Sequence, residues 1–358
     1  MQHKVFLSRA NTYLNTHIAT YLLEHGIACV LGIEDGTEPS RCQHLSKIYE
    51  NYKLRPEIRQ LDYSVIASVT AAIEDCDVII HSIGTEDWYE TKEGVDCYKN
   101  TISETLLLMQ CASKLHIKRL IFSSSLVSVY GGLTKSNIEV TDTDWGNMYN
   151  MTAQARAYLY TERAVWSFNQ TLPKPLHLTV LNLGTLFGPS LSTLEKHGSI
   201  KFMLRVLNGT AESLLRVKMP FIDVRDAALV HVLIISKPQT HDQRYNLCQG
   251  TYWMSDLAEI INDEFGFMGL KASTSVIGMI PVKLASLFSS NLKPILFHCS
   301  KDLKISSFRI REIVTVKLRA FDESVLDMAY TLIDRGQVKK EIDIIKNFSK
   351  SARQDGDS

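Results

Sequence analysis

The turn that follows the first apolar run of the chain is the first place where residue types could do chemistry. Residues 5–7 form that run, and residues 18–23 carry apolar side chains at helical spacing up to Gly26. A strand, a tight turn and a helix in this order form the entry to a nucleotide-binding domain, where glycines let the backbone approach a diphosphate. The turn at residues 8–17 contains no glycine. The sequence therefore predicts a nucleotide-binding outline with weakened phosphate binding.

No other set of reactive side chains shows a recognised catalytic or metal-binding spacing. The chain contains no G-x-S-x-G nucleophile turn, no H-E-x-x-H pair and no Walker loop. Its seven cysteines are scattered from Cys29 to Cys299 without a C-x-x-C pair, which favours neither a disulfide framework nor a zinc site. We therefore expect no metal, and we expect the cysteines to be buried and reduced.

Composition and charge restrict the class of partner. Of the 358 residues, 45% are apolar and 22% are charged, which is ordinary for a soluble globular protein. Because 39 basic residues balance 39 acidic ones, no net charge attracts nucleic acid or an anionic membrane. No apolar run reaches the ~18 residues of a membrane span, and the first residues lack a secretory signal. We expect a cytoplasmic protein without a nucleic-acid partner.

Apolar, β-branched runs alternate with segments of helical composition over the first half of the chain. After the opening unit, the runs lie at residues 28–35, 76–84, 117–125 and 176–184. Parallel strands need long crossover connections, so this alternation predicts a doubly wound parallel sheet of the α/β class.

The alternation fades after about residue 190, which predicts a second, smaller domain. We expect a Rossmann-type domain at residues 1–190, with residues 219–250 returning to it. Residues 191–218 and 251–350 would form a smaller, mostly helical domain that binds substrate or another ligand. Residues 351–358 form a polar tail.

Several of these segments resemble the extended short-chain dehydrogenase/reductases, particularly the branch of dihydroflavonol reductase, 3β-hydroxysteroid dehydrogenase and nucleotide-sugar epimerases. The resemblance covers about residues 4–338. It implies a Rossmann fold, a nicotinamide cofactor, a small apolar alcohol or ketone as substrate, and a homodimer formed through the helices near 100–115 and 158–168. The segments that carry it, in the family's order, are "QLDYS" (60–64), "CDVIIH" (76–81), "KRLIFSSSLVSVYG" (118–131), "LGTLFGPS" (183–190), "FIDVRDAA" (221–228) and "RYNL" (244–247).

The resemblance also locates the family's phosphate-binding glycines. A pattern of the form T-G-A-x-G-x-x-G-x-H lies over residues 8–17 and places Arg9, Thr12 and Asn15 at the three glycine positions. Side chains there cost on the order of 1 kcal/mol or more in strain, and Thr12 and Asn15 would intrude where the backbone must meet the pyrophosphate. We expect NAD to bind weakly or not at all. The alternative is that the helix N-terminus and the Arg9 guanidinium still bind the diphosphate.

Other candidate cofactor contacts follow from the same resemblance. Asp62 resembles the family's adenine-contacting aspartate, and Asn11 and His81 lie in the turn and at a strand end near the cofactor. Glu34, with Asp35, suits a ribose 2′-hydroxyl and repels a 2′-phosphate, which favours NAD over NADP. Solvated loop acids and a structural histidine are the alternative interpretations of these residues.

The family's catalytic pair is a tyrosine and a lysine four residues later on one helix, where the lysine lowers the pKa of the phenol. The helix "QARAYLYTERAVWSF" aligns with Tyr-x-x-x-Lys-x-x-x-Glu so that Gln154 occupies the tyrosine position and Tyr158 the lysine position. No lysine lies between Lys135 and Lys174. If Tyr158 were the acid, Glu162 would lie beside it and raise the pKa of its phenol, which is the unfavourable direction.

The family's catalytic serine matches Ser125, with Ser124 as the alternative, although a structural strand-end serine fits the residue as well. Two functional hypotheses follow. The first is a catalytically degenerate relative that acts as a ligand-binding or interaction module. The second is an active NAD-dependent oxidoreductase that uses Ser125 with Tyr158 or water for proton transfer and Arg9 for the diphosphate. The loss of both the glycines and the lysine favours the first hypothesis.

Overall fold

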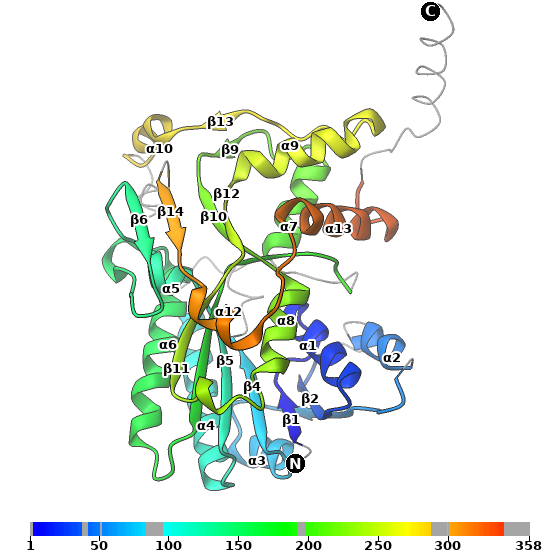
Figure 1. Ribbon diagram of the computed structural model, residues 1–358, viewed down its shortest axis with the longest axis vertical. Helices are drawn as coiled ribbons and strands as arrows, with labels where there is room; N and C mark the ends of the chain where they lie inside the picture. The colour runs from blue at the N-terminus through cyan, green and yellow to red at the C-terminus, as the bar shows by residue number, and fades with distance from the viewer. Residues whose placement is uncertain are drawn as a thin grey trace, which may run out of the picture.

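A computed structural model describes residues 3–37, 42–50, 52–83, 96–191, 198–287, 299 and 301–339 of the chain (Figure 1). The predicted polar tail at 351–358 lies outside these residues. Across the described part of the chain, no helix has both the length and the apolar character needed to cross a bilayer.

A seven-stranded parallel sheet forms the centre of the fold and confirms the predicted doubly wound architecture (Figure 1). Strand β3 forms one edge of the sheet and β11 the other, and β1 and β4 are neighbours near its middle. The strands, in spatial order, are β11 (Gln243–Leu247), β7 (His177–Leu183), β5 (Arg119–Ser125), β4 (Val78–Ser82), β1 (Lys4–Leu7), β2 (Ala28–Glu34) and β3 (Glu57–Leu61).

Helices cover both faces of this sheet because each strand presents alternate apolar side chains to opposite sides. In β1, Val5 and Leu7 join the core shared with α1 and α8, whereas Phe6 joins the core shared with α3, α4 and α6. The helices that follow the strands are α1 (Tyr13–Glu24), α2 (Gln43–Tyr49), α3 (Ile66–Ile73), α4 (Asp96–Lys114), α5 (Val127–Tyr130), α6 (Ala153–Thr171) and α8 (Val224–Leu233).

The remaining elements lie beyond the carboxyl ends of the sheet strands (Figure 1). They include short strand pairs between distant segments, such as β6 with β14, that the sequence pattern did not predict. These elements are β6 (Asn137–Val140), β8 (Thr185–Phe187), α7 (Gly198–Leu207), β9 (Leu214–Leu215), β10 (Lys218–Asp223), β12 (Gly250–Trp253), α9 (Met254–Phe265), β13 (Val276–Ile277), α10 (Met279–Ala285), β14 (Asp302–Ile305), α12 (Phe308–Val314) and α13 (Phe321–Asp334).

Candidate functional site

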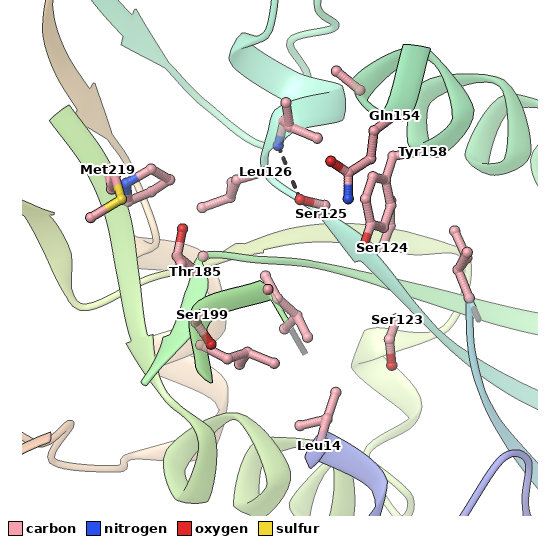
Figure 2. A pocket seen from close by; sticks show the side chains of 18 of the residues that line it. Leu14, Ser123, Ser124, Ser125, Leu126, Gln154, Tyr158, Thr185, Ser199 and Met219 are labelled. Carbon is pink, nitrogen blue, oxygen red and sulfur yellow. Dashed lines mark hydrogen bonds between the residues drawn. The ribbon is translucent and has the colours of Figure 1, made fainter. Parts of the chain in front are cut away.

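A cavity of about 380 Å³ lies at the carboxyl ends of β4, β5 and β7, where the start of α1 and the first turns of α6 also reach it (Figure 2). In open α/β sheets this edge, at the point where strand order reverses, is where ligands bind. Among the described residues that line the cavity, none carries a charge at neutral pH. The apolar part of the wall includes Leu126, Val127, Leu186, Phe187, Phe202, Met219 and Met254.

Gln154 and Tyr158 both line the cavity from successive turns of α6 (Figure 2). The helix begins beside the cavity because Thr152 caps it, accepting a 3.2 Å hydrogen bond from the Ala155 N–H to its Oγ1. The structure therefore brings the amide and the phenol to one wall of the cavity. A lysine or arginine is missing from the described part of that wall.

The structure distinguishes the two candidate serines at the end of β5, which both line the cavity (Figure 2). The Ser124 hydroxyl donates to the buried Glu162 carboxylate at 2.7 Å, so its proton is committed. The Ser125 Oγ accepts a hydrogen bond from the Val127 N–H at 3.3 Å, which leaves the hydroxyl proton available to a ligand. Ser125 is therefore the serine that can bind a substrate carbonyl.

A buried ion pair lies behind these serines, and sequence reasoning missed its role. Glu162 is fully buried, and its Oε1 accepts from Arg244 Nε at 2.5 Å. Its Oε2 accepts from Ser124 and also from Ser128 and Asn182, at 2.6 and 2.9 Å. The sequence predicted that the Glu162 carboxylate would disfavour Tyr158 as the catalytic acid. That prediction did not include Arg244, whose guanidinium offsets the carboxylate charge. The "RYNL" segment contained the signal, but only the fold pairs it with α6.

The turn before α1 has no glycine, but its backbone at Arg9 adopts a conformation that favours glycine. Arg9 adopts φ +46°, in the left-handed region that favours glycine, at a cost on the order of 1 kcal/mol. Thr12 directs its hydroxyl to the Arg9 carbonyl at 3.0 Å instead of capping α1. The first N–H groups of α1 therefore lack a side-chain cap, and Tyr13 and Leu14 bring this helix end to the cavity.

The sequence predicted that Asn15 would obstruct the phosphate site, but its side chain does not line the cavity. Its buried amide donates to the Ser8 carbonyl at 2.7 Å, and its Oδ1 accepts from the Ser82 hydroxyl at 2.9 Å. Ser82 in turn donates to Ser123, whose hydroxyl lies 2.8 Å from His231 Nε2. The side chain at the third glycine position thus ties α1 to the ends of β1, β4 and β5. Of the two predicted obstructions, only Thr12 lines the cavity.

Arg9 does not extend toward the cavity, which corrects the role expected for it at the diphosphate. Its Nη2 pairs with Glu104 of α4 at 2.5 Å, and its guanidinium lies 4.3 Å from the centre of the Tyr63 ring. Burial raises the pKa of Glu104, although Arg9 opposes that shift, and burial raises the pKa of Tyr63 to about 12. The cluster lies near the carboxyl ends of β1, β2 and β3, which we call the β2–β3 side.

The predicted adenosine contacts occupy this same β2–β3 side, away from the cavity. Glu34 is exposed at the end of β2. Asp62 follows β3 and accepts from the Ser64 hydroxyl and N–H at 2.6 and 2.8 Å, which lowers the pKa of its carboxyl. Asn11 is half-buried in the turn. The structure therefore separates these residues from Ser125, Gln154 and Tyr158, which lie on what we call the β4–β5 side.

His81 belongs to the interior and is not among the described residues that line the cavity. It is fully buried, with Nδ1 2.8 Å from the Ser8 hydroxyl and Nε2 3.0 Å from the Thr105 hydroxyl. Burial lowers the pKa of its imidazole well below the ordinary value, so the ring is neutral. Its two nitrogens link β4 to β1 and α4, which is the structural role that the sequence left open.

Comparisons with known proteins place this geometry in a family. A family model described as the NAD dependent epimerase/dehydratase family matches residues 10–248. The chain is 24% identical to cinnamoyl-CoA reductase 2 of Arabidopsis thaliana, over 72% of this chain and 76% of that protein. It is 23% identical to the NADPH-dependent methylglyoxal reductase of Saccharomyces cerevisiae, over 86% of this chain and 94% of that protein.

Solved structures show the same fold. The yeast methylglyoxal/isovaleraldehyde reductase, in complex with NADPH, superposes with a TM-score of 0.73 at 17% identity, covering 94% of this chain and all of that one. Vestitone reductase from alfalfa (Medicago sativa) superposes with a TM-score of 0.72 at 17% identity, covering 93% of this chain and 99% of that one. Both agree with the predicted resemblance to the extended short-chain dehydrogenase/reductases.

These relatives overturn the interpretation of the chain as a catalytically degenerate binding module. These two proteins are named as reductases, and the matches extend over 72% and 86% of this chain. The missing glycines and lysine do not by themselves imply a catalytically degenerate protein, because the fold accommodates Asn15 and neutralises Glu162 without closing the cavity. The findings favour an active oxidoreductase with an atypical site.

Proposed function

The chain belongs to the NAD-dependent epimerase/dehydratase family, and on that premise we propose that it is an NAD(H)-dependent oxidoreductase acting on a small apolar aldehyde or ketone. One observation carries the proposal. Ser125, Gln154 and Tyr158 converge on a cavity at the carboxyl edge of the sheet, and the described residues of its lining carry no charge (Figure 2). A neutral, largely apolar wall with a few hydroxyl and amide groups suits a neutral carbonyl compound, since burial of a charged substrate would lack a partner.

The residues fit one half of a nicotinamide cofactor. The uncapped N-terminus of α1, with Tyr13 and Leu14 at the cavity, suits a diphosphate. Ser82 and Ile83 of the β4 end and the serines of β5 would border the nicotinamide ring. On the β2–β3 side, by contrast, Arg9 covers Tyr63. When bound, the cofactor supplies the hydride that reduces the carbonyl carbon.

The chain's own residues would handle the carbonyl oxygen. Ser125 has a hydroxyl proton to donate, and the Gln154 amide adds a second donor on the same wall. Tyr158 would transfer the proton as the oxygen takes up negative charge. A neutral phenol donates a proton and only a phenolate accepts one, so without a neighbouring lysine we expect carbonyl reduction to be faster than alcohol oxidation at neutral pH.

The acidic β2–β3 side favours NADH over NADPH. Glu34 lies at the end of β2, and with Asp62 it raises the pKa of Glu104 through its negative charge. The single positive charge of Arg9 is outnumbered in this cluster by the carboxylates of Glu34, Asp62 and Glu104. A 2′-phosphate would therefore meet repulsion from carboxylates. This distinguishes the proposal from the NADPH bound to the yeast reductase.

The family resemblance also supports a homodimer formed through α4 and α6. Leu106 and Leu107 of α4 and Trp166 and Phe168 of α6 are only partly buried, although they pack against the same core. A continuous apolar helix pair of this kind suits a second copy of the chain. Analytical ultracentrifugation of the purified protein would test it, and a monomer at all concentrations would contradict it.

Turnover assays with defined variants test the proposed activity. NADH consumption would be followed with methylglyoxal, isovaleraldehyde and cinnamaldehyde as substrates for the parent, Ser125→Ala and Tyr158→Phe. We expect kcat to fall about 100-fold or more in Tyr158→Phe and about 10-fold or more in Ser125→Ala. Tyr149→Phe is the matched control, because Tyr149 is 82% exposed on the surface. Absence of turnover in the parent with every carbonyl substrate, or equal rates in parent and variants, would contradict the proposal.

A further inference from the structure

Arg9 occupies the half of the nucleotide crevice that the cavity does not reach. In a dinucleotide-binding sheet the diphosphate lies at the first helix, with the adenosine over the strand whose acid meets the ribose and the nicotinamide on the opposite side. In this chain that acid is Glu34 at the end of β2, and Tyr63 follows β3. The cavity wall instead comes from β4, β5 and β7, and neither Arg9, Glu34 nor Asp62 belongs to it.

Two side-chain contacts and one backbone hydrogen bond hold Arg9 on the β2–β3 side. Its guanidinium stacks on Tyr63 and pairs with Glu104, and its backbone N–H donates to the Tyr63 hydroxyl at 3.0 Å. The Arg9 side chain is only 10% exposed, so these groups form a closed unit and not a solvated surface pair. Tyr63 is itself almost completely buried, and Arg9 covers one face of its ring.

The Arg9 guanidinium nevertheless retains unused binding capacity. Its Nη1 is buried without a hydrogen-bond partner among the described residues. A buried donor without an acceptor makes the position of Arg9 between Tyr63 and Glu104 less favourable, because that N–H group has lost its hydrogen bonds to water without gaining another. The left-handed backbone at Arg9 adds strain to the same residue. The Arg9 guanidinium is therefore shielded from water, but not all of its N–H groups have hydrogen-bond acceptors among the described residues.

From these contacts we propose that Arg9 is a built-in occupant of the adenosine end of the cofactor site. The nicotinamide half of the cofactor would bind the cavity directly, whereas the adenosine half binds only after the guanidinium leaves Tyr63 and Glu104. This inference rests on the proposed function, since it concerns the same cofactor. Its consequence is that the adenosine half adds little to cofactor affinity in the parent, because the gain from new contacts is offset by displacing Arg9.

Calorimetric titration with a whole and a half cofactor tests the inference. Kd would be measured for NADH and for reduced nicotinamide mononucleotide, which lacks the adenosine half, on the parent and on Arg9→Gly. We expect the two Kd values to agree within about 3-fold in the parent. In Arg9→Gly, which suits the left-handed backbone, we expect NADH to bind at least 10-fold more tightly than the mononucleotide.

Two further variants guard against a change in folding. Glu104→Gln keeps Arg9 and its backbone but removes the ion pair, so it should shift the ratio in the same direction by a smaller factor. Arg59→Ala removes another paired arginine, one that contacts Glu57 and Asp75 far from the cavity, and should leave the ratio unchanged. Thermal unfolding of each variant confirms that the compared proteins are folded.

The possible results separate this inference from the proposed function. If NADH already binds the parent at least 10-fold more tightly than the mononucleotide, Arg9 does not obstruct the adenosine half and the inference fails alone. An unchanged ratio in both Arg9→Gly and Glu104→Gln has the same meaning. If neither nucleotide binds any of the proteins, the proposed cofactor dependence fails and this inference fails with it.

Discussion

The β2–β3 side and the β4–β5 side of the sheet edge departed from the family pattern in the same way, by replacement of functional residues, but with opposite structural results. At the turn before α1, Arg9 and Asn15 turn inward and fill the space with paired side chains. On α6, Gln154 and Tyr158 face an open cavity. The difference teaches that a missing motif residue predicts lost function only if the replacing side chain blocks the site.

The reason for the difference lies in the partners within reach. Arg9 finds a carboxylate on α4 and an aromatic ring after β3, so its charge is satisfied locally. On the other side, the charges lie one layer deeper, where Glu162 pairs with Arg244, and the described residues of the cavity wall are neutral. Four predictions test this contrast, in order of expected size.

Breaking the pair behind the β4–β5 side should have the largest effect. Arg244→Met leaves the fully buried Glu162 carboxylate without its cation, which should lower the free energy of unfolding by about 3–5 kcal/mol. Urea denaturation at neutral pH measures the change. The double variant Arg244→Met with Glu162→Gln should recover part of the loss. Arg59→Met, which breaks a partly exposed pair, should cost less than about 1 kcal/mol. Equal losses for the two single variants would contradict the buried-pair account.

Lowering the pH should reduce the free energy of unfolding, because buried histidines lie next to the β2–β3 side and the β4–β5 side. Burial lowers the pKa of His17 and of His231 to about 4. Because an unfolded histidine binds a proton at its ordinary pKa near 6.5, acid favours the unfolded state, and stability is lost as pH falls from about 6.5 toward 4. Each histidine should contribute about 1.4 kcal/mol per pH unit, or about 2 kcal/mol between pH 6.5 and 5.

Urea midpoints measured at several pH values would show this slope. His231→Asn should reduce it by the share of one histidine, whereas the exposed His25→Asn should leave it unchanged. A constant unfolding free energy from pH 6.5 to 5 would exclude the assignment of these rings as neutral.

Removing the side chain at the third glycine position should moderately destabilise the packing of the start of α1 against the ends of β1 and β4. Asn15→Ala deletes the amide donor to the Ser8 carbonyl and the acceptor for Ser82, both buried, and should cost about 1–3 kcal/mol. Asn11→Ala, in the same turn but half-buried, should change the unfolding free energy by no more than about 0.5 kcal/mol. If Asn15→Ala proves neutral or stabilising, Asn15 is an obstruction and not a tie between strands.

The smallest effect concerns cofactor choice. Glu34→Ala should narrow the preference for NADH over NADPH by about 2- to 5-fold, since an exposed carboxylate contributes at most about 1 kcal/mol. The ratio of kcat/KM values for the two cofactors measures it. Glu24→Ala, at the far end of α1, is the control and should leave the ratio unchanged. A parent that prefers NADPH would remove the role proposed for Glu34.

The sequence by itself determined the architecture and the chemical inventory. Alternating apolar runs specify parallel strands, and within β1 the order of Val5, Phe6 and Leu7 assigns each residue to one of the two cores. The missing glycines and the absence of lysine between Lys135 and Lys174 were also evident from the residues alone. These properties depend on neighbours in the chain, so local periodicity and composition report them.

Only the tertiary structure decided what the replacements do. Arg9 pairs with a residue 95 positions away, and Glu162 with one 82 positions away, and in each case the partner decides whether a charge faces the site or is neutralised away from it. The choice between Ser124 and Ser125 likewise depends on which hydroxyl meets Glu162. Such contacts form because crossover connections bring distant segments to one sheet edge, and no local pattern encodes which side chains will meet there.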